Sequence, residues 1–286
     1  MKPWIIIPAH NRRELTLGCV RHLARLGELE RHTVLVIDDG SSDGTGAAVH
    51  AEFPSVEVMR GDGRMWWTGA IAAGMSHAFA VGATAVCWLN DDCLPEAGTL
   101  GHLAAHAAAH PGELVAPVCV AASDGSPIPT AFIGRRPLVV GATSVQTVDG
   151  VSGFCVWVPL ETWRRAGVPD AAHFPHYYGD TAYMLVARRV GCQVTLLSTC
   201  LARLVHYVPR STTVGEFLAK LPSGSAPWPT TFVSLRSPFR LATQFNYLRL
   251  RYGAGAGTLL ALARLAGWQV AFAAALLRRR RPAVAA

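Results

Sequence analysis

Short apolar runs and amphipathic stretches alternate along the first hundred residues. The apolar runs end in polar residues and predict buried strands over Trp4 to Ile7, Val34 to Ile37, Val56 to Met59 and Ala85 to Leu89. The stretches between them carry apolar residues at helical spacing and predict helices over Arg13 to Leu26, Thr45 to Glu52, Ala70 to Ala80 and Leu94 to His110. Asp43 is a candidate N-cap for the second of these helices. Consecutive βαβ units of this kind predict a doubly wound α/β sheet.

From about Val115 the pattern changes to β-leaning segments interrupted by Gly and Pro, which predict mixed or antiparallel pairing. We expect two helices there, over Leu160 to Ala166 and Thr181 to Val190, and two late strands, over Val194 to Leu197 and Leu204 to His206. Residues 211–229 show no regular pattern, and we expect them to be mobile, with 223–229 the least ordered.

Carboxylates stand where the predicted strands end. Asp38 and Asp39 follow the second strand, Asp91 and Asp92 follow the fourth, and Asp180 opens a predicted helix. In open α/β sheets, ligands bind at the carboxyl ends of the strands. Carboxylates gathered there repel one another unless a cation offsets their charge. The pattern indicates a metal and a nucleotide, the alternative being that Asp and Ser serve as turn and N-cap residues.

Composition narrows the class of protein. With 286 residues, the chain can form one large α/β domain or two small ones. It is 51% hydrophobic with a mean hydropathy of +0.27, which is short of a polytopic membrane protein. The apolar run before Pro8 is too short for a signal-peptide core. Seven Cys without CxxC spacing fit reduced, packed thiols and a cytoplasmic location.

The net charge of +7 includes a run of arginines, Arg278 to Arg281, at the end of an apolar stretch. No RNA- or DNA-binding motif accompanies it, so we expect no nucleic acid partner. The apolar stretch, Thr258 to Leu277, is interrupted by Arg264 and Gln269. A charge in the middle of a span is costly, which favours an interfacial or core-docked helix over a transmembrane one. The arginines would then contact anionic head groups on the inner face of the cell membrane.

Four segments in sequence order carry a resemblance to a known family: IIIPAHNR, VLVIDDGSSDGT, WLNDDC and YYGDTAYMLVARRVG. Together with GDGRMWWTGAIAAGM, they resemble family 2 glycosyltransferases of the GT-A fold over roughly residues 3–210. The resemblance implies a mixed, mostly parallel sheet flanked by helices, followed by a C-terminal helical extension. It implies a nucleotide-sugar-binding half over 1–115, an acceptor-binding half of the same domain over 116–210, and the extension over 211–286.

The resemblance also implies a set of donor-binding residues. Those near the nucleotide base would be Pro8, Ala9 and Asn11, with Asp39 accepting the uracil or thymine N3–H and Asp38 and Ser41 supporting its loop. Small residues would let the backbone approach the donor at Gly69, Ala73 and Gly74, and Trp66 and Trp67 would line the sugar pocket. The alternatives are a helix cap for Asn11, close helix packing for Ala73 and a core position for the tryptophans.

Asn90-Asp91-Asp92 resembles the DXD motif of the family, with Asn in place of the first Asp. The resemblance implies that Asp92 binds Mg²⁺ or Mn²⁺ and that Asp91 contacts the ribose or the water shell of the metal. Such an ion offsets the charge that develops on a departing diphosphate. His206 falls where some members place a further metal ligand, the alternative being a structural histidine.

Asp180 matches the catalytic base of the family, which removes the proton of the acceptor hydroxyl during inverting transfer. The family motif has the form ED-x-D-L/F, whereas this chain reads Gly179-Asp180-Thr181-Ala182-Tyr183, so the flanking acids are absent. That departure affects how the acceptor is oriented rather than which residue is the base. Gly153 resembles part of the loop that frames the acceptor.

The sequence as a whole predicts an inverting, metal-dependent glycosyltransferase of the hexosyltransferase type. Its donor would be a UDP- or dTDP-sugar, and its acceptor a glycan or lipid-linked precursor of a bacterial cell-surface polysaccharide. Two alternatives remain: a sugar-nucleotide nucleotidyltransferase, and a catalytically silent GT-A-like module that binds a membrane or a partner. We expect a cytoplasmic protein with peripheral membrane contact. The sequence leaves the oligomeric state open, a homodimer included.

Overall fold

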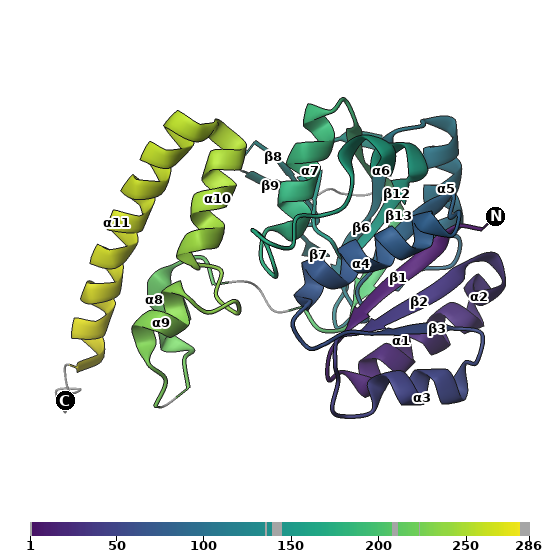
Figure 1. Ribbon diagram of the computed structural model, residues 1–286, viewed down its shortest axis with the longest axis horizontal. Coiled ribbons are helices and arrows are strands. Elements are labelled where there is room, and N and C mark those ends of the chain that lie inside the picture. The colour runs from purple at the N-terminus through teal and green to yellow at the C-terminus, as the bar shows by residue number, and fades with distance from the viewer. Residues whose placement is uncertain (1, 135, 139–144, 208–210, 223, 281–286) are drawn as a thin grey trace. The chain divides into compact units, whose positions relative to one another are not determined.

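The computed structural model describes residues 2–134, 136–138, 145–207, 211–222 and 224–280 (Figure 1). The chain divides into two compact units. The first contains Met1–Ala171 and Gly179–Tyr207, and the second contains Ala172–Tyr178 and Val208–Ala286.

The first unit alternates strands and helices along its first half. Its strands are β1 (Trp4–Ala9), β2 (Thr33–Asp38), β3 (Glu57–Arg60), β4 (Ala85–Leu89), β5 (Cys93–Pro95), β6 (Glu113–Ala121), β7 (Pro127–Ile128), β8 (Ala131–Ile133), β9 (Arg136–Leu138), β10 (Val145–Thr147), β11 (Gly150–Val151), β12 (Cys155–Pro159) and β13 (Gln193–Leu204). Its helices are α1 (Arg13–Arg25), α2 (Glu28–Arg31), α3 (Thr45–Glu52), α4 (Trp66–Ala80), α5 (Thr99–Ala109), α6 (Leu160–Ala166) and α7 (Gly179–Arg189).

The main sheet has the order β10-β13-β6-β12-β4-β1-β2-β3. The neighbours β4, β1, β2 and β3 are parallel, and β6 is parallel to β13. Because β12 is antiparallel to both β4 and β6, these two parallel groups run in the same direction. A small second sheet has the order β11-β8-β9. This confirms the mixed, mostly parallel sheet that the sequence predicts.

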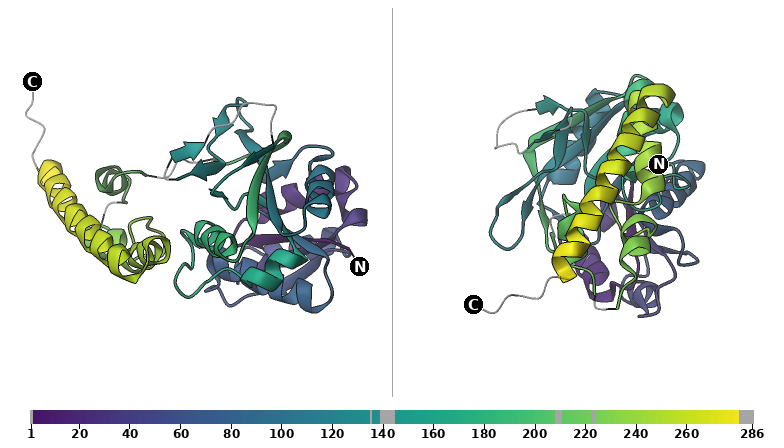
Figure 2. Two further views of the ribbon diagram at one scale, coloured as in Figure 1. Left: turned by 90° about the horizontal axis from the view of Figure 1, so that it is seen from above. Right: turned by 90° about the vertical axis from the view of Figure 1, so that its left-hand side faces the viewer.

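Helices cover both faces of the main sheet, and alternate strand residues supply the two core layers (Figure 2). In β1, Ile5 and Ile7 pack in the layer that contains α1, α3 and α5, whereas Trp4 and Ile6 pack in the layer that contains α4 and α7. Such two-sided burial explains why the parallel strands are near-continuous apolar runs. All seven cysteines are buried free thiols.

The second unit is helical, with α8 (Val214–Ala219), α9 (Pro227–Phe232), α10 (Leu241–Tyr252) and α11 (Ala254–Arg280). Thr213 and Glu216 form a capping box at the start of α8. An aromatic core holds these helices together, with Phe232 and Phe272 5.2 Å apart and Phe239 against Trp268 at 5.0 Å, measured between ring centroids.

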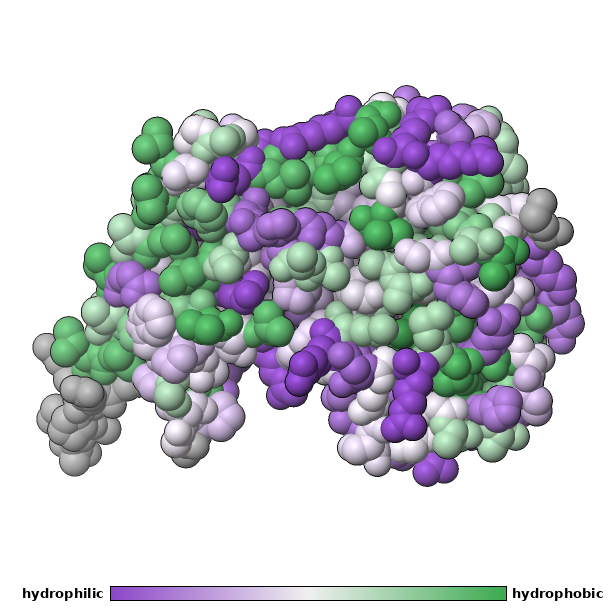
Figure 3. All heavy atoms as spheres, viewed as in Figure 1, coloured by the Kyte–Doolittle hydropathy of each residue, from purple (hydrophilic) through white to green (hydrophobic). Residues whose placement is uncertain are grey.

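One side of helix α11 packs against the rest of the second unit, and the other side exposes apolar residues. Over Ala254–Arg278 it has the length and composition of a membrane-spanning helix, and only 11% of an apolar 18-residue stretch within it is buried. Its two interior polar residues face the unit itself, since Arg264 donates to Gln244 and Gln269 accepts from Trp228. Leucine and valine side chains remain exposed along the other side, over which hydrophobic surface is visible in Figure 3: Leu259, Leu262, Val270 and Leu277.

Long-range strand pairing changes three predicted elements. Helix α5 begins at Thr99 rather than at Leu94, because Leu94 belongs to β5, which pairs with the distant strand β13. The two late strands are one strand, β13, with an irregularity between Leu197 and Leu201. Each difference comes from long-range pairing that local periodicity does not encode.

The segment 211–229, which the sequence predicts to be mobile, contains α8 and α9, both anchored by the aromatic core. Ser223, within the part predicted to be the least ordered, lies outside the described residues. At α3 the N-cap is Gly44, in the left-handed region at φ 78°, and not Asp43. The carboxylate of Asp43 nevertheless accepts the backbone N–H of Thr45, so it satisfies the same helix start from one residue earlier.

Candidate active site

Three adjacent parallel strands, β4, β1 and β2, bring the predicted site residues to one edge of the sheet. Asp38 ends β2, and Asp39 follows it. Asp91 and Asp92 follow β4. Between them, Pro8 and Ala9 end β1, and the backbone N–H of Asp39 donates to the carbonyl of Ala9. The sheet order thus gathers residues that are more than 80 positions apart in the sequence.

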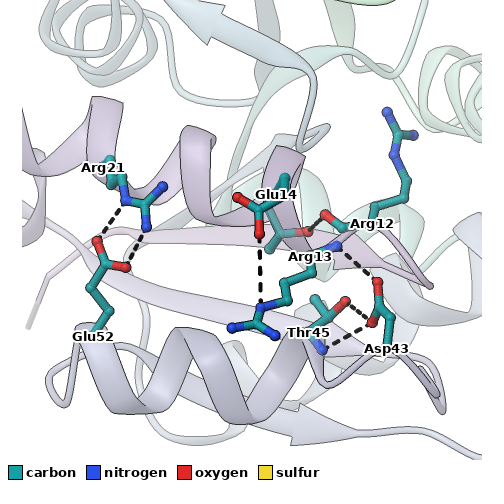
Figure 4. A network of polar contacts seen from close by, with 8 residues as sticks. Arg12, Arg13, Glu14, Arg21, Asp43, Thr45 and Glu52 are labelled. Carbon is teal, nitrogen blue, oxygen red and sulfur yellow. Dashed lines mark hydrogen bonds and ion pairs between the residues drawn. The ribbon is translucent and has the colours of Figure 1, made fainter.

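Asp38 supports the loop that follows it, as the sequence predicts. Its two carboxylate oxygens accept the backbone N–H groups of Ser41 and Gly46 at 2.9 and 3.1 Å. Farther along the same loop, Asp43 also accepts the backbone N–H of Arg13, at the start of α1 (Figure 4). Hydrogen bonds from Thr45 and then from Arg13 hold the pKa of Asp43 below its usual range. One acidic loop therefore organises the beginnings of two helices.

Asp39 organises a second loop, the one that leads into α4. Its carboxylate accepts the backbone N–H groups of Gly63, Met65 and Trp66 at 2.8, 3.2 and 2.9 Å. Trp66 adopts a left-handed φ of 56°, a strained conformation for a bulky residue. A Cβ at Gly61 would lie 2.6 Å from Asp39 Oδ1, so only glycine fits there. Three of the roughly four acceptor positions of the carboxylate are used, and the fourth is open to a further donor.

Asn11 connects the end of β1 to the acidic loop. Its backbone N–H donates to Ser41 Oγ at 2.9 Å, and its side-chain oxygen accepts the backbone N–H of Ser42 at 2.7 Å. Like Trp66, Asn11 has a left-handed backbone, with φ 52°. The helix-cap alternative is wrong for Asn11, because the residue at the N-cap of α1 is Arg12.

Arg12 bridges the two carboxylates that follow β4. Its Nη2 lies 2.6 Å from Asp92 Oδ2, and its Nη1 lies 3.3 Å from Asp91 Oδ1. Thr16 Oγ1 donates to the other oxygen of Asp91 at 3.1 Å. The pKa of Asp91 is raised to about 6. Burial is the largest cause, the charge of Arg12 lowers the pKa, and the charge of Asp92 raises it. The guanidinium therefore offsets a pair of carboxylates that would otherwise repel each other.

Asp92 retains one oxygen that nothing satisfies. Its Oδ1 is buried and has no hydrogen-bond partner among the residues that the structure describes. A buried, unsatisfied carboxylate oxygen is energetically unfavourable. Hard divalent cations bind carboxylate oxygens of this kind, so the residues present at this edge fit the Mg²⁺ or Mn²⁺ that the resemblance implies. The cation that contacts the other oxygen of Asp92 is Arg12, whose side chain is 37% exposed.

A contact chain leads from the carboxylates to Asp180. Trp67 Nε1 donates to the side-chain oxygen of Asn90 at 2.8 Å, and the backbone N–H of Asn90 donates to Phe154. The backbone N–H of Gly153 then donates to Asp180 Oδ2 at 2.9 Å. A Cβ at Gly153 would lie 2.4 Å from the Trp67 ring, which accounts for glycine in this loop. Asp180 is half-buried in the first turn of α7, at the positive end of the helix.

His206 lies beyond the end of β13 and not in a strand. The preceding residue, Val205, donates its backbone N–H to the carbonyl of Asp92 at 2.8 Å, so the backbone brings His206 near the Asp91–Asp92 pair. Its side chain is exposed, and no polar contact of it is found among the described residues.

Gly69 lies in the first turn of α4. A Cβ built on Gly69 would lie 3.3 Å from Met65 Cβ.

Trp67 and Gly74 of α4 both contact the core, in different ways. Trp67 packs edge-on against the buried ring of Trp88, with 5.7 Å between centroids, and is itself only partly buried. Gly74 is where the helix meets β1, because a Cβ there would lie 2.6 Å from Ile6. Close helix packing is therefore observed at Gly74, next to the partly buried Ala73 for which the sequence offered the same interpretation.

Arg12 is the residue of this site that the sequence interpretation missed. The signal was a basic residue directly after Asn11 in a strand-end loop, where it faces acidic residues from a neighbouring strand. The asparagine of the Asn90-Asp91-Asp92 motif was likewise identified only as a replaced acid. In the structure its amide oxygen accepts a hydrogen bond from the indole N–H of Trp67. A carboxylate at this position could accept the same hydrogen bond.

Comparison with known proteins agrees with this geometry. The sequence model of the family described as Glycosyl transferase family 2 matches residues 4–136. No protein of curated function matches the sequence. The structure resembles that of GalNAc-T7 with UDP, GalNAc and Mn²⁺, with a TM-score of 0.63 and 14% identity over 87% of this chain and 48% of that one.

Two microbial glycosyltransferase structures are also similar. S. aureus TarS 1–349 in complex with UDP-GlcNAc gives a TM-score of 0.56 and 14% identity over 87% of this chain and 81% of that one. The mannosyltransferase PcManGT from Pyrobaculum calidifontis, in complex with GDP-Man and Mn²⁺, gives 0.55 and 17% over 97% and 79%. The chain spans about half the length of GalNAc-T7 and 37% of the longer TarS chain. Residues 4–136 thus match the model of glycosyl transferase family 2, and the first unit has the fold of the GT-A glycosyltransferases.

Proposed function

We propose that this protein is an inverting, metal-dependent glycosyltransferase that uses a UDP- or dTDP-sugar. The observation that carries the proposal is the connected set at one sheet edge: Asp39, the Asp91–Asp92 pair and Asp180. The similar structures support a nucleotide-sugar donor and a divalent ion, since GalNAc-T7 contains UDP and Mn²⁺, and PcManGT contains GDP-Man and Mn²⁺.

The proposed metal ligands are Asp92, through its unsatisfied oxygen, and His206, with Asp91 contacting the ribose or the water shell. A bound Mg²⁺ or Mn²⁺ would supply charge that offsets the diphosphate of the donor. The bridge that Arg12 makes to both carboxylates supports this assignment, because it marks the place where the protein already requires positive charge.

The proposed catalytic base is Asp180. As the acceptor hydroxyl attacks the anomeric carbon, its proton passes to the Asp180 carboxylate, and the nucleoside diphosphate departs with the electrons of the broken bond. Hydrogen bonds from the backbone N–H groups of Gly153 and Thr181 keep the carboxylate oriented. Asp39, with one acceptor position left, is the proposed partner of the N3–H of the base.

Donor hydrolysis with a panel of UDP-, dTDP- and GDP-sugars tests this function. We expect release of UDP or dTDP with Mg²⁺ or Mn²⁺, and none with EDTA. Asp92→Asn should reduce the rate about 100-fold or more, because the metal then lacks its charged ligand. Asp124→Asn, an exposed turn residue, is the matched control. Hydrolysis that survives both EDTA and Asp92→Asn would contradict a metal-dependent mechanism, and hydrolysis of GDP-sugars alone would contradict the proposed nucleotide.

The acceptor we propose is a glycan or lipid-linked precursor of a bacterial cell-surface polysaccharide, reached on the cytoplasmic face of the membrane. The exposed apolar side of α11 supports this location, because Leu259, Leu262 and Val270 remain uncovered although the opposite side of the helix packs. The arginine run, of which Arg281 lies outside the described residues, would contact anionic lipid, each arginine contributing about 1 kcal/mol near the surface.

Vesicle co-sedimentation tests the membrane contact. Replacing two exposed apolar residues, Leu259→Gln with Val270→Gln, should lower binding to anionic vesicles about tenfold or more, because each such side chain contributes about 1 kcal/mol or more on burial. Val190→Gln removes an equally large exposed side chain from the first unit and is the control. High salt should weaken binding of the intact chain. Absence of binding by the folded chain at low salt would refute the contact.

A further inference from the structure

Histidines recur at every fourth position in one helix, in a pattern that the proposed function does not use. The segment HLAAHAAAHPGEL places His102, His106 and His110 at successive turns of α5 and its C-terminus, followed by Glu113. Residues four apart lie on one face of a helix. Two histidines at that spacing are a common arrangement for a transition-metal ion.

The structure brings three of these residues together. His106 lies in the last turn of α5, His110 is its C-cap, and Glu113 is the first residue of β6. One possible ligand atom from each residue lies within 4.8 Å of the other two, and His106 Nε2 is 3.0 Å from Glu113 Oε2. Ligands around a tetrahedral Zn²⁺ are separated by about 3.4 Å, given metal–ligand bonds of about 2.1 Å. A small rotation of the exposed His110 side chain supplies the difference.

The hydrogen bonds of the cluster set where its protons lie. His106 Nε2 donates to Glu113 Oε2, so this proton leaves when the nitrogen binds a metal. His110 Nδ1 donates to the carbonyl of His106 at 3.0 Å, so its Nε2 carries the lone pair that a metal needs. Glu113 accepts a hydrogen bond from Thr195 Oγ1 at 2.9 Å. Thr195 thus stands as a second partner that would orient a metal-bound carboxylate.

This cluster is separate from the carboxylates of the candidate active site. Glu113 begins β6, and the pairing of β12 with both β6 and β4 places Glu113 level with Ala85, at the start of β4. The length of β4, Ala85 to Leu89, is about 13 Å, and Asp91 and Asp92 lie beyond its far end. The histidine cluster is therefore at the opposite edge of the sheet.

We propose that His106, His110 and Glu113 form a second metal site, which binds Zn²⁺ or a similar late first-row ion. Two imidazoles and one carboxylate select such ions over Mg²⁺ and Ca²⁺, which prefer oxygen ligands. With His110 exposed, water completes the coordination. The ion joins the end of α5 to the start of β6, so its binding stabilises the first unit and takes no part in transfer.

Zn²⁺ titration of the full chain, with a reductant and saturating Mg²⁺ present, tests this site by isothermal calorimetry. We expect one Zn²⁺ per chain, and a rise in the thermal unfolding midpoint with Zn²⁺ concentration. The double variant His106→Ala with His110→Ala should lose this binding. Thr195→Val, close to isosteric, should weaken it about 10–100-fold through loss of the hydrogen bond to Glu113. His102→Ala, on the same helix but outside the cluster, is the control.

The outcomes separate the two metal sites. Zn²⁺ binding that persists in the double variant, with unchanged stoichiometry and affinity, overturns the proposal. Binding that is lost in Asp92→Asn but kept in the double variant also overturns it, since Zn²⁺ then reports the carboxylates of the other edge. Far-ultraviolet circular dichroism establishes that each variant is folded. Because the readouts are binding and thermal stability, failure of this proposal leaves the proposed transferase function untouched.

Discussion

Asp39 and Asp92 follow strands on either side of β1, and both are almost completely buried, yet the protein holds them in opposite ways. Asp39 accepts three backbone N–H groups from the loop that leads into α4. Asp92 has one oxygen on the side chain of Arg12 and another without any partner. The first carboxylate is satisfied by the main chain, and the second by a side chain that is partly exposed.

This difference indicates which of the two carboxylates can bind a metal in place of its present partner. Backbone donors are fixed by the fold, so Asp39 is part of the architecture that positions Trp66 and α4. The Arg12 side chain is 37% exposed, so it can move to solvent when another cation takes its place beside the buried carboxylates. Asp92 can therefore exchange its cation for a metal without unfolding a loop. The following predictions test this distinction.

Asp180 extends the comparison, because its two oxygens have different partners. Oδ2 accepts the backbone N–H of the distant Gly153, whereas Oδ1 accepts, among the described residues, only from the adjacent Thr181. We expect Asp180→Asn to reduce sugar transfer 10²–10⁴-fold, the usual loss on removal of a general base. The Kd for the donor should change little, since Asp180 need not contact the nucleotide. Transfer kinetics and calorimetric donor binding measure the two quantities. A variant that retains a tenth of the wild-type rate would rule out Asp180 as the base.

Removal of Asp39 should have the largest effect on stability. Asp39→Ala leaves three backbone N–H groups without their acceptor, and we expect the free energy of unfolding to fall by about 3 kcal/mol. Asp92→Ala removes an unsatisfied oxygen and a like charge next to Asp91, so we expect a change within about 1 kcal/mol.

Urea denaturation of both variants in EDTA compares them directly, with Asp124→Ala as the surface control. Equal losses of stability for Asp39→Ala and Asp92→Ala would contradict the distinction between a carboxylate held by the backbone and one held by a side chain.

Arg12 should compete with the metal for Asp92. Arg12→Gln removes the cation that Mn²⁺ would have to displace from Asp92, so we expect Mn²⁺ to bind about fivefold more tightly in the absence of nucleotide, a difference of about 1 kcal/mol. Electron paramagnetic resonance titration of free Mn²⁺ measures this change. The neighbouring Arg13→Gln, whose guanidinium lies beside Glu14 instead, should leave the affinity unaltered (Figure 4). Weaker binding in Arg12→Gln would mean that Arg12 organises the metal ligands rather than competing for them.

Local pattern was sufficient for much of the first unit. The boundaries of β4 and α6 agree with the sequence prediction to the residue, because each is a short apolar or amphipathic segment bounded by turn residues. It was insufficient for β5 and for the continuous strand β13, which form because they pair with each other across more than a hundred positions. In the second unit, α8 and α9 depend on packing around Phe232 and Phe272.

The sequence alone determined which carboxylates stand at strand ends, since the apolar runs specify where each parallel strand stops. It also identified the family through the tandem acidic motifs. Only the tertiary structure decided how each carboxylate is satisfied. Arg12 reaches Asp92 across 80 positions, and the donors to Asp39 come from a loop more than 20 residues away. Hydrogen-bond partners are set by three-dimensional proximity, which no local pattern of apolar and polar residues encodes.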